Sequence, residues 1–280
     1  DDFFSDKKLR LINPISSDLD TLRTSMFSNL LIHSKNNVDR GHKNLMLFEV
    51  GPIFKGKKPG QQNTVATGIL MGNKIEKNWM KKTESFNPYD SKSDVLQILT
   101  DLGIDSSKLV VNNNSNQSFH PGRAGSFYLG SAKGPLLACF GELNPTIVNQ
   151  LELDSFSPCG FEIYLDNIVE PKRKIKDSKK AYVVSKFQAV DRDFAFIVDK
   201  NISASQLISA VRDCDPLLIT NIDIFDVYEG DNIKQDKKSV AFSVKLQSME
   251  KTLDEKTIEE ISQKIISSVQ SCTGGTLRSS

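Results

Sequence analysis

Few side chains in this chain could carry acid–base or nucleophilic chemistry. The chain has only three histidines, and none follows residue 120. His120 and Arg123, in the stretch SFHPGRAG, could act as a catalytic pair, but no nearby Ser or Cys forms an obvious triad with them. Pro121 and Gly122 between them are typical of a tight turn. The sequence therefore favours a structural turn here and leaves a catalytic or ligand-binding role as the alternative.

Two carboxylates, Asp191 and Asp193, flank Arg192 and could work as paired acids. No histidine lies nearby, and the pattern places the three residues at the end of a strand, so we expect a salt-bridged or capping role instead. The four cysteines are far apart and form no CxxC motif, which is typical of isolated thiols in a reducing compartment. We accordingly predict a cytoplasmic protein without metal ligands.

The composition is that of a globular protein with one large or two ordinary domains. The 280 residues are 38% hydrophobic and 25% charged, and the net charge is +1. This balance excludes the strongly basic class of autonomous nucleic-acid-binding proteins. No apolar run approaches the roughly 18–20 residues of a membrane span. The chain opens with DDFFSDKKLR, without an initiator Met or a signal-peptide pattern, so we expect a fragment of a longer protein.

A basic stretch divides the chain. Between residues 170 and 180, six of the eleven side chains are Lys or Arg, and apolar residues are nearly absent. This charge run predicts a solvated linker over 170–184, between a first domain at 1–169 and a second at 185–280. Contact with a phosphate backbone is a compatible alternative. From residue 181 onward the chain has 15 Asp and Glu against 12 Lys and Arg, so the second domain has no excess of positive charge.

The first domain mixes helices and strands. A helix is predicted to open at the capping-box-like pair Ser17 and Asp20 and to stop at Gly41. Trp79, the single tryptophan, is expected in packing or at an interface. Further helices are predicted within 87–103 and 144–152. Strands are predicted at 45–54, 64–72, 125–131, 135–143 and 159–168, the first two as antiparallel neighbours.

The second domain has a clearer pattern. Strands are predicted at 192–199, 221–230, 238–247 and 276–278, and helices within 201–213 and 252–275. The first helix should begin at the capping box of Ser203 and Gln206, and the second at that of Thr252 and Glu255. Gly274 is the expected stop of the second helix. The order βαββαβ is that of the ferredoxin-like split unit.

This four-stranded sheet should have one buried and one open face, because alternate residues of a strand point to opposite sides. The large apolar residues of 192–199 and 238–247 should cover the two helices. The other face is then small and polar, and suits a shallow platform for a ligand strand or a partner, with a plain solvated face as the alternative. The strand at 221–230 is ambiguous, because either Ile222, Ile224 and Tyr228 or Phe225 and Val227 could face the core.

Nine segments in order resemble one family. They are NPISSDLDTLRTSM, LFEVGPIF, FHPGRAG, FGELNP, DRDFAFIVD, IFDVYEG, KKSVAFSVKLQ, KTLDEKTI and the terminal GGTLR. Together they make the chain similar, over essentially its whole length, to the C-terminal part of bacterial phenylalanyl-tRNA synthetase beta subunits. The resemblance implies an α+β protein, with a class II synthetase-like antiparallel sheet domain followed by a ferredoxin-like βαββαβ anticodon-binding domain.

The resemblance also implies that the first domain is not catalytic. Class II synthetases have a strand ending in Phe-Arg-x-Glu, whose Arg grips the ATP α-phosphate. Here the matching strand continues as Phe54, Lys55, Gly56 and Lys57. Lys55 is a point charge without the planar fork of Arg, and Lys57 replaces the acid. A second signature, a Gly-rich segment ending in Arg, is absent from the sequence. We predict no catalytic residues, no adenylation and no cofactor bound by this chain.

In the family, two alpha and two beta chains assemble, and the alpha chain holds the active site. The resemblance predicts that this chain scaffolds the alpha subunit and binds the anticodon region of phenylalanine tRNA, without membrane contact. ATP and magnesium are implied for the complete enzyme. The alternatives are a scaffold without RNA contact and a stand-alone enzyme that uses His120 and Arg123. RNA contact is predicted at Asp193, Ser239, Ala241, Ser243, Lys245 and Arg278.

Overall fold

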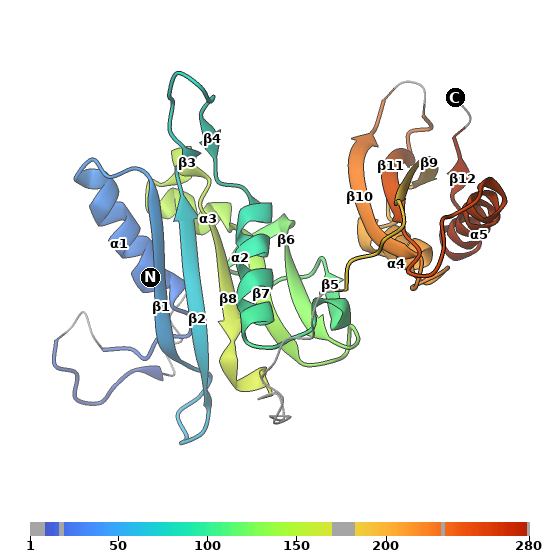
Figure 1. Ribbon diagram of the computed structural model, residues 1–280. Coiled ribbons are helices and arrows are strands. Elements are labelled where there is room, and N and C mark those ends of the chain that lie inside the picture. Colours follow the sequence, from blue (N-terminus) through green and yellow to red (C-terminus); the bar gives the residue numbers. More distant parts are fainter. Residues whose placement is uncertain (1–8, 17–19, 170–182, 231–232, 279–280) are drawn as a thin grey trace. The chain divides into compact units, whose positions relative to one another are not determined.

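The computed structural model describes residues 9–16, 20–169, 183–230 and 233–278 (Figure 1). The chain divides into two compact units near residue 175, and each unit is described by itself. The predicted linker, 170–184, lies outside the described residues except for Val183 and Val184, and the predicted domain limits stay a prediction. None of the described helices combines the length and apolarity that crossing a membrane requires.

Unit 1 is built on a six-stranded sheet in the order β1-β2-β8-β7-β6-β5, in which every neighbouring pair is antiparallel. The predicted strand at 45–54 and its antiparallel pairing with the next strand are confirmed. The short strand β5 and the separate β3–β4 hairpin were not predicted. The strands are β1 Leu45–Phe54, β2 Gln62–Met71, β3 Asn73–Ile75, β4 Glu84–Ser85, β5 Leu109–Asn112, β6 Phe119–Leu129, β7 Leu136–Leu143 and β8 Cys159–Tyr164.

Helix α1, Phe27–Asp39, packs on one face of this sheet and starts later than the sequence predicts. The segment before it is held against β1 instead, because the Phe54 amide donates to the Arg23 carbonyl at 2.9 Å. The Arg23 Nε also donates to the Pro52 carbonyl at 3.0 Å. These bonds hold Arg23 beside β1. Asp20 lies outside any helix, so the predicted start is wrong at this residue, and Ser17 lies outside the described residues.

Helix α2, Pro88–Asp101, packs on the opposite face, over β7 and β8. Asn87 and Asp90 form a capping box at its start, as two side chains accept from each other's backbone amides. Val95 and Leu99 are buried against Phe161 and neighbouring apolar residues of the sheet. The remaining helical segments are α3 Pro145–Gln150 and the short 3-10 turns η3 Ser106–Lys108, η4 Asp154–Phe156 and η5 Leu165–Asn167.

Unit 2 has the predicted βαββαβ order, and its four-stranded antiparallel sheet runs β10-β11-β9-β12. Helices α4 and α5 cover one face and share a core with β9 and β11. Phe194, Phe196 and Phe242 stack in that core. The elements are β9 Val190–Asp199, α4 Ala204–Arg212, β10 Ile219–Tyr228, β11 Lys237–Leu246, α5 Glu255–Thr273 and β12 Thr276–Leu277.

The helix ends of unit 2 follow local capping chemistry. The capping box of Ser203 and Gln206 is confirmed at α4. At α5 the predicted box of Thr252 and Glu255 is wrong: Asp254 is the N-cap, and its carboxylate accepts from the Thr257 amide at 2.9 Å. A carboxylate suits this place because the helix N-terminus carries partial positive charge. Gly274 ends α5 as predicted, with a φ of 66°.

Candidate nucleic-acid interface

The strand register of unit 2 places the six predicted RNA-contact residues on one face of the sheet. Residues directly opposite each other in an antiparallel pair share a face. Ser243 lies opposite Asp193, and Ala241 lies opposite Ala195. Arg278 follows β12, and its amide donates to the Ala195 carbonyl at 2.8 Å, which sets it in the same row. We call this face, opposite the two helices, the open face.

Solvent access differs among the six residues. Asp193, Lys245 and Arg278 are exposed, and Ala241 and Ser243 are half-buried. Ser239 is only 3% exposed. The prediction that Ser239 is accessible on the open face is therefore wrong, and it offers a ligand almost no surface. The other five remain predicted contacts.

Strand β10 adds an aromatic residue that the sequence did not place. Ile222 and Ile224 pack against the core, as one predicted pattern requires. A register shift after Ile224 then inserts Phe225 as an extra residue, so Tyr228 lies opposite Ser239 on the open face. A bulge breaks the alternation of a strand. The first predicted pattern therefore holds for Ile222 and Ile224 but not for Tyr228, and the second is wrong, because Phe225 and Val227 are 59% and 54% exposed. Tyr228, 39% exposed, is an aromatic side chain available for stacking there.

The open face is more acidic than the prediction assumed. Asp223 lies opposite Ser243 and Asp226 opposite Ala241, and Asp191 lies opposite Lys245. Within the described part of the chain, none of the open-face carboxylates forms an ion pair, and neither does Arg192. The predicted salt-bridged or capping role of Asp191 and Asp193 therefore finds no ion pair among the described residues and stays a prediction. Two cations, Lys245 and Arg278, stand among four aspartates, which limits their attraction for phosphate.

The alternative catalytic pair lies inside a strand rather than in a tight turn. His120 and Arg123 belong to β6, in a stretch with irregular pairing between Phe119 and Ala124. The Gly122 amide donates to His120 Nδ1 at 3.0 Å, so this ring nitrogen accepts a hydrogen bond from the neighbouring backbone. Arg123 Nε lies 2.9 Å from a Glu142 carboxylate oxygen. The predicted turn is therefore wrong, and both side chains have structural partners.

The residues that match the ATP-gripping motif lie in the turn between β1 and β2. The Lys55 amide donates to the Gln61 carbonyl at 2.8 Å, and the Gln61 amide donates to the Lys58 carbonyl at 3.1 Å. Lys55 and Lys57 are exposed, and the turn at 55–61 contains no carboxylate. Magnesium bound with ATP needs carboxylate oxygens. These residues do not fit a nucleotide–magnesium site, and we assign them no step of ATP chemistry.

Comparisons with known proteins find one family match in each of the two units. The family described as "Phenylalanyl tRNA synthetase beta chain CLM domain" matches residues 1–165. The family described as "Ferredoxin-fold anticodon binding domain" matches residues 185–278, which include the open face.

Curated relatives carry the name "Phenylalanine--tRNA ligase beta subunit". The chain is 41% identical over 271 residues to the protein of Rhodospirillum rubrum, a match that covers 97% of this chain and 33% of the relative. Identity to the protein of Paramagnetospirillum magneticum is 38% over 271 residues, covering 97% and 34%. Identity to the protein of Bartonella henselae is 38% over 275 residues, with the same coverage. The chain thus spans about a third of the length of these relatives.

Proposed function

This chain belongs to the phenylalanyl-tRNA synthetase beta chain family, and we propose that its second unit binds the anticodon region of phenylalanine tRNA. One observation supports the proposal above all: the sheet of unit 2 has a helix-free face that carries two exposed cations, Lys245 and Arg278. A sheet face of this kind can lie against the loop of an RNA hairpin, where bases are unstacked and accessible.

The side chains of the open face divide the work of recognition. Lys245 and Arg278 neutralise phosphates, which supply affinity but little sequence information. Asp193 and Ser243 accept or donate hydrogen bonds at base edges, which discriminate between bases. Tyr228 offers its ring to one base at the edge of the sheet. Because four aspartates surround the two cations, we expect this unit alone to bind weakly, with the rest of the enzyme and the tRNA body supplying the remaining affinity.

We also propose that unit 1 binds the alpha subunit through β1. Met46, Phe48 and Val50 are exposed on the face of β1 opposite the one that packs against α1, and Phe48 is 78% exposed. Helix α2 packs over β7 and β8 and leaves this edge of the sheet bare. Obligate interfaces bury apolar strips of this kind.

The complete enzyme supplies the chemistry in this proposal. The alpha subunit performs ATP- and magnesium-dependent aminoacylation in the cytoplasm, within an assembly of two alpha and two beta chains. This chain, with Lys55 and Lys57 at the ATP-gripping position, contributes tRNA binding and scaffolding and no catalytic residue. A scaffold without RNA contact is the rival function, and the acidity of the open face favours it.

Single-residue variants of the full chain separate the two functions. Lys245→Ala and Arg278→Ala should each weaken binding to transcribed phenylalanine tRNA and should each lower the salt slope by about 0.7–0.9. Lys264→Ala is the matched control, since this exposed lysine lies on α5, away from the open face. Equal affinity for tRNA in all three variants would refute the open-face site and leave the scaffold.

A further inference from the structure

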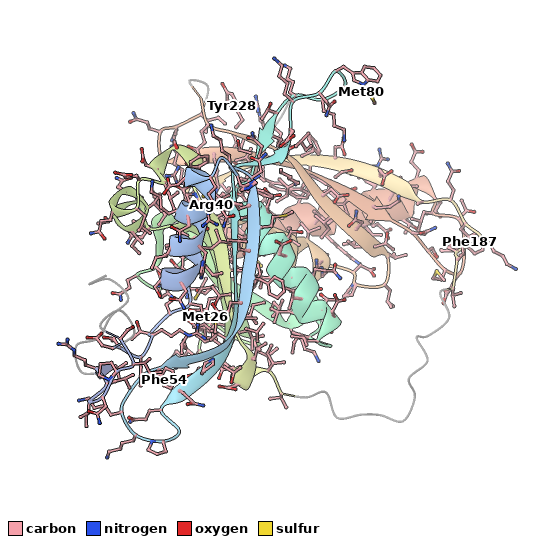
Figure 2. All side chains as sticks on the ribbon, turned by 90° about the vertical axis from the view of Figure 1, so that its left-hand side faces the viewer. Met26, Arg40, Phe54, Met80, Phe187 and Tyr228 are labelled. Atoms are coloured by element: carbon pink, nitrogen blue, oxygen red, sulfur yellow. The ribbon has the colours of Figure 1, made fainter. Side chains whose placement is uncertain are left out.

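The β3–β4 hairpin presents a bare tryptophan. Trp79 is 93% exposed and the adjacent Met80 is 69% exposed, so Trp79 is not packed in the core, and the interface, the other predicted role, stays a prediction. Figure 2 shows Met80 at the outer end of this hairpin, away from the six-stranded sheet. We call residues 77–83 the hairpin tip. A large aromatic side chain that is exposed to solvent at the end of a projecting element is typical of a binding site.

The hairpin tip is held in a defined conformation. At its base, the Asn73 amide donates to Asn44 Oδ1 at 2.8 Å, and Lys74 Nζ lies 2.6 Å from a carboxylate oxygen of Asp90. At its end, the amides of Met80 and Lys81 both donate to Asn78 Oδ1 at 2.9 Å. A ligand therefore meets an ordered tip, and little entropy is lost on binding.

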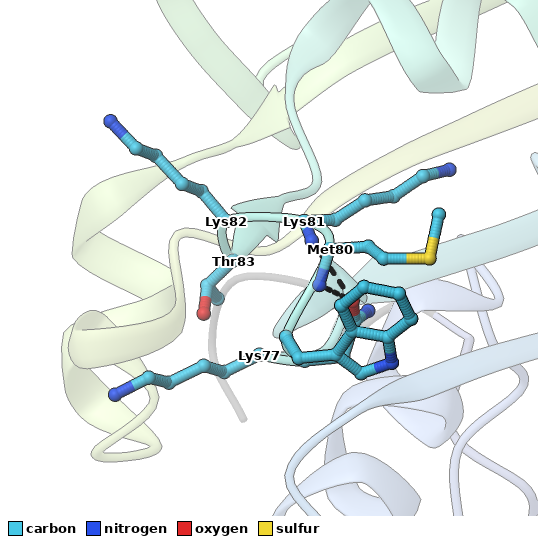
Figure 3. A pocket seen from close by; sticks show the side chains of 7 residues that line it. Lys77, Met80, Lys81, Lys82 and Thr83 are labelled. Atoms are coloured by element: carbon cyan, nitrogen blue, oxygen red, sulfur yellow. Dashed lines mark hydrogen bonds between the residues drawn. The ribbon is translucent and has the colours of Figure 1, made fainter.

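The charge of the hairpin tip is uniformly positive. Lys77, Lys81 and Lys82 lie in it together with no acidic residue. In the described part of the chain, no carboxylate lies within ion-pair distance of any of the three. Figure 3 shows Lys77 and Lys82 extending to one side of the tip and Lys81 to the other. Three unpaired cations around one tryptophan suit an anionic partner that also has a flat apolar face.

We propose that the hairpin tip is a second RNA contact, which binds a single-stranded segment by stacking a base on the Trp79 indole. Lys77, Lys81 and Lys82 neutralise the phosphates on either side of that base. Aromatic stacking combined with basic side chains is the common mode of single-strand binding. The inference rests on the proposed function only in taking RNA as the ligand, because the tip belongs to unit 1 and contains no open-face residue.

RNA fits this tip better than a protein or a membrane does. A stable protein interface covers about 800 Å² per partner with many apolar side chains, whereas the tip offers Trp79 and Met80 alone. A membrane-binding element needs a broad apolar face. One base needs only one aromatic ring, and its neighbouring phosphates need only a few cations.

The single tryptophan makes the test specific. Because Trp79 is the only tryptophan of the chain, its emission reports on the hairpin tip alone. The full chain is titrated with a single-stranded RNA of about ten nucleotides, a length within the range that one binding module covers. We expect saturable quenching of the emission as a base stacks on the indole. RNA that binds by anisotropy of an attached label, yet leaves the emission unchanged, overturns the inference.

Variants measured by anisotropy then separate stacking from charge. Trp79→Leu should weaken binding about tenfold or more, whereas Trp79→Phe should retain most of it. Lys81→Ala/Lys82→Ala should lower the salt slope by about 1.4, and Lys57→Ala/Lys58→Ala, in the exposed β1–β2 turn, should leave it unchanged. Equal losses in both double variants refute a local phosphate contact.

Other polyanions define the remaining outcomes. Inorganic polyphosphate that binds as tightly as RNA, with no loss in Trp79→Leu, would reduce the tip to a non-specific polyanion contact. A blue shift on vesicles of phosphatidylcholine and phosphatidylserine, without quenching by RNA, would make it a membrane contact. The open-face variants Lys245→Ala and Arg278→Ala retain Trp79, so the tip and the proposed anticodon site fail or succeed independently.

Discussion

The two sheets of this chain handle burial in different ways. The four-stranded sheet has helices on one face only, and buried residues alternate with more exposed ones over 194–198 of β9 and 240–246 of β11. The middle of the six-stranded sheet lies between α1 and α2, and all six residues of β8 are buried. A sheet covered on one side keeps a face for ligands, whereas a sheet covered on both sides must satisfy its polar groups internally.

In the sheet that is covered on both sides, Glu162 of β8 is a carboxyl group buried in the interior. The Tyr164 hydroxyl donates to this carboxylate at 2.9 Å, and Asn116 Nδ2 and Ser25 Oγ approach it at 3.5 Å. Thr67 lies opposite Glu162 in the register, and its buried hydroxyl has no hydrogen-bond partner among the described residues. Burial raises the pKa of the Glu162 carboxyl, and these donors offset the shift only in part.

The largest expected effect comes from the core of the one-sided sheet. Phe196 is fully buried, with its ring 5.7 Å from that of Phe242. Phe196→Ala should lower the free energy of unfolding of unit 2 by about 3–5 kcal/mol, through lost burial and a cavity. Hydrogen exchange read by mass spectrometry should show faster exchange in β9–β11 and unchanged exchange in β7 and β8. Equal acceleration in both sheets would mean that the units unfold together.

A smaller, pH-dependent effect should come from the two-sided sheet. The ordinary pKa of a glutamate is 4.5, and burial raises that of Glu162. At a pH between the ordinary pKa and the raised pKa, Glu162 keeps its proton in the folded chain and releases it in the unfolded chain. The free energy of unfolding therefore falls as pH rises through this range. Glu162→Gln removes the titrating group. The free energy of unfolding of this variant, relative to that of the unsubstituted chain, should therefore rise with pH.

Denaturant titrations at a series of pH values measure this difference. Glu84→Gln is the control for the substitution itself, because Glu84 is exposed in the short strand β4. A difference for Glu162→Gln that does not change with pH would show that Glu162 ionises in the folded chain as readily as in the unfolded one.

The smallest expected effect on stability comes from the N-terminus of α5, which covers the one-sided sheet. Asp254→Ala removes the N-cap of α5 and should lower the free energy of unfolding of unit 2 by about 1 kcal/mol. Thr252→Ala should change it by much less, because the Thr252 side chain does not cap the helix. Chemical denaturation of both variants compares the two, and a larger loss in Thr252→Ala would restore the capping box that the sequence suggested.

The same contrast explains what the sequence could predict. In the one-sided sheet, alternation of Phe194, Phe196 and Val198 identified the buried face of β9 correctly. In β10 the alternation failed at Phe225, because a bulge depends on pairing with β11 and has no signal in the strand itself. The late start of α1 was equally unpredictable, since it depends on the long-range bonds of Arg23 with Pro52 and Phe54.

The candidate site was predictable in position but not in its surroundings. The alternation of residues along each strand was enough to predict Asp193, Ser243 and Lys245 on one face, and the register confirms that they share it. The burial of Ser239 and the presence of Tyr228 depend on the course of β10, which the sequence left open. For Trp79 the sequence left packing and an interface open. It could not decide between them, because tryptophan is found both buried and exposed and the hairpin that exposes Trp79 is too short to be predicted.

The most direct test of the proposed function compares two tRNAs on the unaltered chain. Affinity for phenylalanine tRNA and for the same tRNA with a substituted anticodon is measured over a salt series. We predict weak binding that falls with salt for both and is weaker for the substituted anticodon at every salt concentration. Equal affinity for the two tRNAs would contradict anticodon recognition by the open face.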